Sequence, residues 1–155
     1  MNGDLDANSG SYSFNGGLEA VETGWSDLLL ELEGILTDVD AGIHKTKVSL
    51  EKTMRERMLY SPPSLNKSIS ALFEEGGWVK TRVMCDYPTD YYKPGYEPKP
   101  LNPGAFREMD FLKDRLGAEI QFGKYAFMVY NVCAKMTIFH NLDHIDAGVE
   151  IVPVK

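Results

Sequence analysis

Apolar residues in the first third of the chain recur every three or four positions, between residues 18 and 36. This spacing predicts one amphipathic helix of about five turns, with its apolar side buried in a core. The apolar positions are Leu18, Val21, Trp25, Leu28, Leu29, Leu32, Ile35 and Leu36. The acidic residues expected to face solvent are Glu22, Asp27, Glu31 and Glu33.

A second helix is predicted to start at the Ser-Pro-Pro-Ser sequence of residues 61–64, because proline is tolerated in the first helical turn. It is expected to end at Gly76 and Gly77, since glycine readily takes left-handed dihedrals. The preceding segment, residues 46–60, is polar and basic. It fits either an exposed helix or a mobile loop.

Strand patterns fill much of the second half of the chain. Residues 78–84 predict one strand, and residues 106–113 and 116–122 predict two strands joined by a tight turn. Residues 149–154 predict a last strand. Residues 86–104 contain five prolines and four tyrosines, which indicates a long irregular loop or an insertion.

Residues 126–140 predict a helix that is apolar almost all round, apart from a narrow polar stripe of Asn131 and Lys135. Such a helix must be covered on most sides. Its large apolar residues could face the sheet or a partner helix, and we expect the core role. They are Phe127, Tyr130, Ala134 and Ile138.

Mixed strands flanked by helices predict an α/β fold with a mixed central sheet. Residues 1–17 fit a flexible tail, and residues 18–155 fit a single domain. The sequence stops soon after a buried-looking strand without a capping element. We therefore expect the C-terminal part of the domain to be missing.

The net charge of −7 is unevenly distributed. Residues 1–40 contain nine acidic side chains and no lysine or arginine, so the remainder has 16 basic and 14 acidic groups. Between residues 45 and 82 the basic groups outnumber the acidic ones two to one, which permits nucleic-acid binding without establishing it. The two cysteines, Cys85 and Cys133, lack metal-ligand spacing, and no signal peptide is evident. Together these features predict a cytoplasmic protein with reduced thiols.

Three oxygen-bearing side chains are expected to converge on the predicted hairpin. Strand alternation places Glu119 and Gln121 on the same face, and the hairpin places Asp110 opposite them. The backbone carbonyl of Ile120 lies between the side chains of Glu119 and Gln121. Carboxylates, a carbonyl and retained waters are the ligands that Mg²⁺ prefers, although acidic strand residues more often simply face water.

The sequence of residues 110–125, DFLKDRLGAEIQFGKY, closely resembles the active-site hairpin of type II restriction endonucleases of the BglII/BstYI group. The match continues through residues 146–153, DAGVEIVP, and more loosely upstream over residues 45–84. These enzymes have a PD-(D/E)xK nuclease core. The resemblance implies Mg²⁺-dependent hydrolysis of duplex DNA at a palindrome centred on GATC, by a homodimer that works with a cognate DNA methyltransferase.

The resemblance also implies a role for each matching residue. Asp110 and the carbonyl of Ile120 would hold Mg²⁺, and Glu119 would bind the metal or orient water. Gln121 stands where most relatives have lysine and would position the attacking water. Lys124 matches a base-contacting position, since lysine can donate to guanine O6 and N7; a solvated or phosphate-binding lysine is the alternative.

The sequence also fits two alternative functions. A truncated remnant of the same fold would be inactive or would bind DNA non-specifically, and its missing strands would leave an exposed sheet edge. A nuclease-fold protein with another DNA task, such as repair, is disfavoured because Gln121 and Lys124 both match the restriction enzymes.

Overall fold

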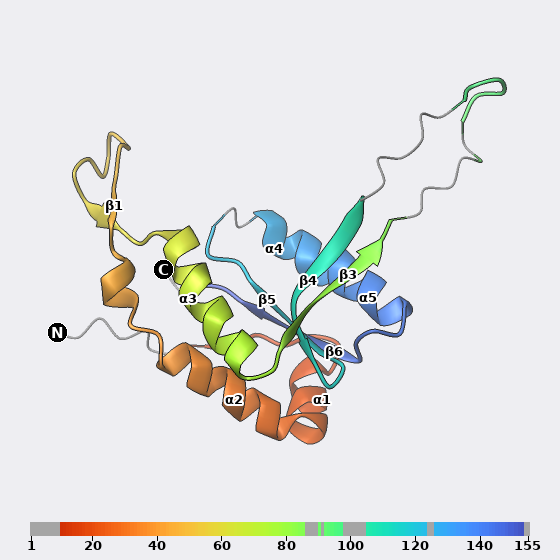
Figure 1. Ribbon diagram of the computed structural model, residues 1–155, viewed down its shortest axis with the longest axis horizontal. Helices are drawn as coiled ribbons and strands as arrows, with labels where there is room; N and C mark the ends of the chain where they lie inside the picture. Colours follow the sequence, from red (N-terminus) through yellow and green to blue (C-terminus); the bar gives the residue numbers. More distant parts are fainter. Residues whose placement is uncertain (1–9, 86–89, 91, 98–104, 124–125, 154–155) are drawn as a thin grey trace.

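The computed structural model describes residues 10–85, 90, 92–97, 105–123 and 126–153. Its centre is a mixed sheet that has four strands among these residues, in the order β3-β4-β5-β6 (Figure 1). Strands β3 (Val79–Met84), β4 (Phe106–Lys113) and β5 (Leu116–Ile120) are antiparallel, whereas β6 (Ala147–Ile151) runs parallel to β5. Helices flank this sheet, which confirms the predicted α/β class.

Strand β5 is the most deeply buried element of the sheet, because all five of its residues are buried. It joins β4 through a two-residue turn in which Asp114 and Arg115 have φ angles of 46° and 68°. The register pairs Phe111 with Ala118 on one side and Ile120 with Ile151 on the other. The predicted strand-turn-strand pattern is therefore confirmed, with β5 ending at Ile120.

The single N-terminal helix predicted from the sequence is wrong, because the structure has two helices. Helix α1 (Gly17–Gly24) and helix α2 (Ser26–Thr37) are separated at Trp25, whose φ of −140° is not helical. The break directs the indole of Trp25 to the β4–β5 turn, where Nε1 donates a hydrogen bond of 2.7 Å to the Asp114 carbonyl. Helical periodicity continues across the break, so it did not reveal this tertiary contact.

Glu31 was expected to face solvent, but it is partly buried and joins α2 to Trp78 and to Lys113 of β4. Its carboxylate accepts hydrogen bonds from Trp78 Nε1 at 2.9 Å and from Lys113 Nζ at 2.7 Å. Burial opposes ionisation, but the bonds from Lys113 and Trp78 outweigh it and lower the pKa of Glu31 below its ordinary value. The acidic side of α2 therefore tethers this helix to the sheet.

Helix α3 (Pro62–Glu75) confirms the second predicted helix, and Gly77, with a φ of 81°, follows its end. The basic segment before it is neither a helix nor an unstructured loop. It contains a short antiparallel hairpin of β1 (Lys47–Val48) and β2 (Met58–Leu59), preceded by the 3₁₀ turn Ala41–His44. Two-residue strands are too short to produce a recognisable alternation in the sequence.

The helix predicted over residues 126–140 is continuous but not uniform. It consists of α4 (Ala126–Tyr130), a π-helical turn η2 (Asn131–Lys135) and α5 (Met136–Asn141). The core role expected for Phe127 and Tyr130 is wrong, because these side chains are 52% and 41% exposed. The polar stripe of Asn131 and Lys135 is directed inward instead, toward partners on the sheet.

Two clusters of buried apolar residues hold the helices on the sheet. The larger joins α1, α2 and α3 to the strands, and within it Phe73 stacks on Phe111 with ring centroids 4.1 Å apart. The smaller surrounds Phe139 of α5 and contains Val83, Met109 and Ile145. Together the two clusters bury both sides of the β4–β5 hairpin, which fixes the position of the hairpin relative to all the flanking helices.

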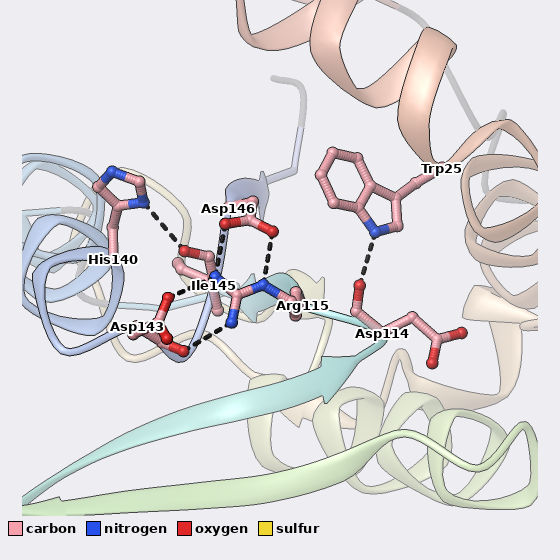
Figure 2. A network of polar contacts seen from close by, with 7 residues as sticks. All are labelled: Trp25, Asp114, Arg115, His140, Asp143, Ile145 and Asp146. Carbon is pink, nitrogen blue, oxygen red and sulfur yellow. Dashed lines mark hydrogen bonds and ion pairs between the residues drawn. The ribbon is translucent and has the colours of Figure 1, made fainter.

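A polar clasp fastens the β4–β5 turn to the loop that leads into β6 (Figure 2). The Arg115 guanidinium donates to Asp146 Oδ2 at 2.6 Å and to both the carboxylate and the carbonyl of Asp143 at 2.8 Å. In return, the Asp146 backbone N–H donates to the Arg115 carbonyl at 2.8 Å. The planar fork of arginine makes this multiple attachment possible.

Most of the predicted irregular segment over residues 86–104 lies outside the described residues, as do residues 1–9 of the predicted tail. Among the helices that are described, none combines the length and the apolar composition needed to cross a membrane. Both cysteines are free thiols, as predicted.

The clasp predicts a difference between two conservative substitutions. Arg115→Lys keeps the charge but loses the fork, so we expect it to lower the thermal unfolding midpoint by several degrees. Arg82→Lys is the matched control, because Arg82 pairs with a single carboxylate, that of Glu108, and should shift the midpoint less. Differential scanning calorimetry measures both. An equal or smaller shift for Arg115→Lys would show that the clasp does not stabilise the turn.

Candidate active site

The β4–β5 hairpin brings two of the predicted site residues into direct contact. Asp110 on β4 and Glu119 on β5 lie one position beyond the register pair of Phe111 and Ala118. The Asp110 backbone N–H donates to Glu119 Oε1 at 3.1 Å, and the Ile120 backbone N–H lies 3.4 Å from Asp110 Oδ2. Of the three side chains expected to converge, Asp110 and Glu119 therefore do so directly.

The second oxygen of Glu119 pairs with a residue that the sequence analysis did not assign to the site. Lys135 Nζ, from the π-helical turn, lies 2.6 Å from Glu119 Oε2. The two side chains are only 12% and 2% exposed. A lysine in an otherwise apolar helix was the available signal, but the sequence alone did not say which way it pointed.

Burial and the neighbouring Asp110 carboxylate raise the pKa of Glu119 above its ordinary value, and the Lys135 ammonium opposes this shift. Without Lys135, the buried Glu119 carboxylate would lie beside the Asp110 carboxylate with no compensating cation. The geometry therefore concentrates negative charge at this point and offsets part of it with one internal cation. Strongly perturbed groups of this kind are frequent at functional sites.

Gln121 contacts the same helical turn as Glu119, as strand alternation predicted. Asn131 Nδ2 lies 3.4 Å from Gln121 Oε1, and the Gln121 amide nitrogen donates to the Gly123 carbonyl. The amide of Gln121 is thus held from both ends. Its oxygen is directed toward the helix, and its nitrogen is directed toward the end of the hairpin segment.

Asn131 also contacts Glu150 on β6, another residue that the sequence analysis did not place in the site. Its Nδ2 donates to Glu150 Oε1 at 3.1 Å, and Glu150 is the register partner of Glu119. The other oxygen, Oε2, is buried and has no hydrogen-bond partner in the described part of the chain. Burial raises the pKa of Glu150 to about 7, despite the opposing contact from Asn131.

A hollow of about 210 Å³ opens beside this cluster, between α3 and the hairpin. Asp110 and Ile120 contribute to its wall, together with Asn66, Ser70, Lys80 and Phe111. Asn66 stands out because its Oδ1 is buried without a hydrogen-bond partner among the described residues. An unpaired buried amide oxygen is costly unless something else binds it.

The oxygen donors around the hollow fit a hard divalent cation. In the described residues, no group of three or more His, Cys, Asp or Glu side chains forms a metal cage. Mg²⁺ does not need one, because it commonly binds one or two carboxylates and keeps several waters. Asp110, the Ile120 carbonyl and Asn66 Oδ1 would supply that small set of protein oxygens. Lys124, the predicted base-contacting residue, lies outside the described residues.

Comparison with known proteins gave one family. The family model described as Restriction endonuclease BglII/BglIII matches residues 10–155. The match covers every described element, including the hairpin with Asp110 and Glu119, and it confirms the family resemblance inferred from the sequence. No curated protein sequence matches the chain.

The buried carboxyl of Glu150 predicts a pH-dependent stability. Its pKa of about 7 in the folded chain exceeds the ordinary 4.5. The unfolded chain therefore releases this proton at lower pH than the folded chain does. The free energy of unfolding should fall as the pH rises from about 4.5 to about 7.

Urea denaturation in EDTA across this pH range measures the effect. Glu150→Gln can still accept from Asn131 but cannot ionise, so the slope of stability against pH should become shallower. Glu119 contributes a slope of the same sign that remains in both proteins. An unchanged slope in Glu150→Gln would show that Glu150 is not held protonated by the fold.

Proposed function

Because the chain belongs to the BglII/BglIII family of restriction endonucleases, we propose that it hydrolyses duplex DNA with Mg²⁺ at a palindrome centred on GATC. Family membership makes DNA the substrate and site-specific cleavage the reaction. We propose in addition the metal ion, the DNA recognition sequence and the catalytic residues. The observation that carries the proposal is the contact between Asp110 and Glu119 beside a hollow whose wall includes Asn66, with an Oδ1 that has no hydrogen-bond partner among the described residues.

Each residue of the cluster then has a role that its position supports. Asp110, with the Ile120 carbonyl and Asn66 Oδ1, would hold Mg²⁺ in the hollow. The ion would supply a Lewis acid that polarises a phosphoryl oxygen and acidifies water. Glu119, held by Lys135, would orient water at the metal, and Gln121 would position the attacking water for in-line displacement. The products would carry 5′-phosphate ends.

Lys80 is a further cation on the wall of the hollow, where it pairs with Glu108 at 3.1 Å. A phosphodiester entering the hollow would meet its ammonium opposite the Asp110 carboxylate. This arrangement favours a bound anion on one side and a bound cation on the other. Both are required in a metal-assisted phosphodiesterase.

A homodimer is the quaternary state that best fits a palindromic target, because a two-fold protein matches a two-fold site. The exposed apolar side chains of α4 support this proposal. Phe127 is 52% exposed and Val129 is 59% exposed. We also expect a cognate DNA methyltransferase as a functional partner, since a nuclease of this specificity would otherwise cut its own genome.

The site assignment predicts the effect of removing one charge. Asp110→Asn should reduce cleavage of a GATC-rich plasmid in Mg²⁺ by about a thousandfold or more, because a principal metal ligand is lost. Asp114→Asn is the matched control, since it removes an exposed carboxylate four residues away. EDTA should abolish cleavage by the parent. Equal cleavage by Asp110→Asn and the parent would exclude Asp110 from the site.

The dimer proposal predicts that a charge on α4 changes the oligomeric state. Val129→Glu should convert the protein from a dimer to a monomer in sedimentation velocity, because an unpaired carboxylate would be buried in the interface. Leu30→Glu is the control, since Leu30 is 67% exposed on α2. If Val129→Glu remains dimeric, the interface lies elsewhere; a monomeric parent would exclude the dimer.

A further inference from the structure

A basic arm projects from the N-terminal end of α3 and consists of residues 45–57 (Figure 1). It contains five cations, and all of them are exposed. They are Lys45, Lys47, Lys52, Arg55 and Arg57. Glu51 and Glu56 are its only acids, so the arm carries +3 while the rest of the chain carries −10.

The five cations of the arm have no carboxylate partners among the described residues, unlike most cations of the sheet and its helices. Lys80, Arg82, Lys113, Arg115 and Lys135 all form ion pairs. In the arm, Lys45 lies over the ring of Tyr60, 5.6 Å from its centroid, and none of the five cations takes part in an ion pair within the described chain. Five cations of the sheet and its helices are thus neutralised within the fold, whereas the five clustered cations of the arm are left available.

Packing does not account for the arm either. Its strands are two residues long, and the apolar side chains of Val48 and Leu50 are 51% and 93% exposed. Ser49 organises the arm instead: its backbone N–H donates to the Arg57 carbonyl at 2.8 Å, and its hydroxyl accepts from the Glu51 N–H at 3.3 Å. The hairpin thus has its own polar framework and contributes little to either apolar cluster.

The arm is fastened to the helix that lines the hollow. The Ser61 N–H donates to the His44 carbonyl at 2.8 Å, and His44 Nδ1 lies 2.8 Å from Ser64 Oγ. Asn66 and Ser70, which follow Ser64 on α3 by two and six residues, line the hollow together with Asp110. A polyanion with one phosphate in the hollow would therefore have its neighbouring phosphates near the positive charges of the arm.

We propose that the basic arm binds the backbone phosphates of duplex DNA beside the cleaved bond. The proposal rests on the proposed function, because it assumes that the hollow receives the scissile phosphate. Phosphate contacts fix the register of a protein on a duplex without reading its sequence. The arm would accordingly add affinity for cognate and unrelated DNA alike and would leave the choice of site to residues elsewhere.

Salt dependence is the sharpest test, because each phosphate neutralised by a cation contributes about 0.9 to the slope of log affinity against log salt. Binding of a GATC-containing duplex would be measured in EDTA over a range of salt concentrations. The quadruple variant Lys47→Gln, Lys52→Gln, Arg55→Gln, Arg57→Gln should flatten the slope by about two to four. In Mg²⁺ the variant should raise the KM for DNA more than it lowers kcat, since the arm binds DNA but does not touch the reacting atoms.

Three single variants complete the test. Lys93→Gln removes one exposed charge outside the arm and should leave the slope unchanged, whereas Lys52→Gln should flatten it. Glu51→Gln removes an acid from the arm and should tighten binding. Circular dichroism would establish that each variant is folded.

The outcomes separate the two proposals. A parent that binds duplex DNA with a slope unaffected by the quadruple variant overturns the arm proposal and leaves the nuclease proposal standing. A parent that binds through the arm but cuts nothing in Mg²⁺ overturns the nuclease proposal alone. A parent that binds no duplex DNA overturns both.

Discussion

The buried ion pair between Glu119 and Lys135 connects the sheet to the helix that covers it, and the other polar contacts of the site are arranged around this pair. One partner comes from the central strand and the other from the π-helical turn. A buried pair is weak evidence of stabilisation, because an apolar replacement of the same shape is often as stable or more stable. The cost of taking Glu119 and Lys135 out of water is therefore not explained by stabilisation alone, and it fits the catalytic role proposed for Glu119.

The π-turn is the local device that makes this pairing possible. An extra residue in one turn changes which side chains face the sheet, and such turns are frequent at functional sites. Here the turn directs Asn131 and Lys135 toward β5 and β6 and leaves Phe127 and Tyr130 exposed. Over α4 and the π-turn, polar side chains face the sheet and large apolar side chains face outward, which reverses the usual arrangement and suits a buried polar site.

This reversal also shows where sequence-based prediction reached its limit. Strand alternation and the hairpin turn correctly predicted that Asp110 meets Glu119, because both depend on local geometry. The break at Trp25, the buried role of Glu31 and the inward direction of Lys135 depend on partners distant in the sequence. A helical pattern predicts which residues lie on the same side of a helix. It does not predict whether carboxylates or apolar groups pack against that side. The short hairpin of the arm was missed because strands of two residues cannot show an alternation of apolar and polar positions.

Register links the distant parts of the structure to the site. The side-chain period of a strand is two, so a slip of one residue in β5 would move Glu119 to the opposite face and separate it from both Asp110 and Lys135. The Arg115 clasp and the Trp25 indole hold the turn at one end of the hairpin, and the carboxylates meet toward its other end. A turn with two left-handed residues is costly on its own, and the contacts that stabilise it also fix the register. The polar clasp on the surface and the buried ion pair therefore act on the same variable, the alignment of β4 with β5.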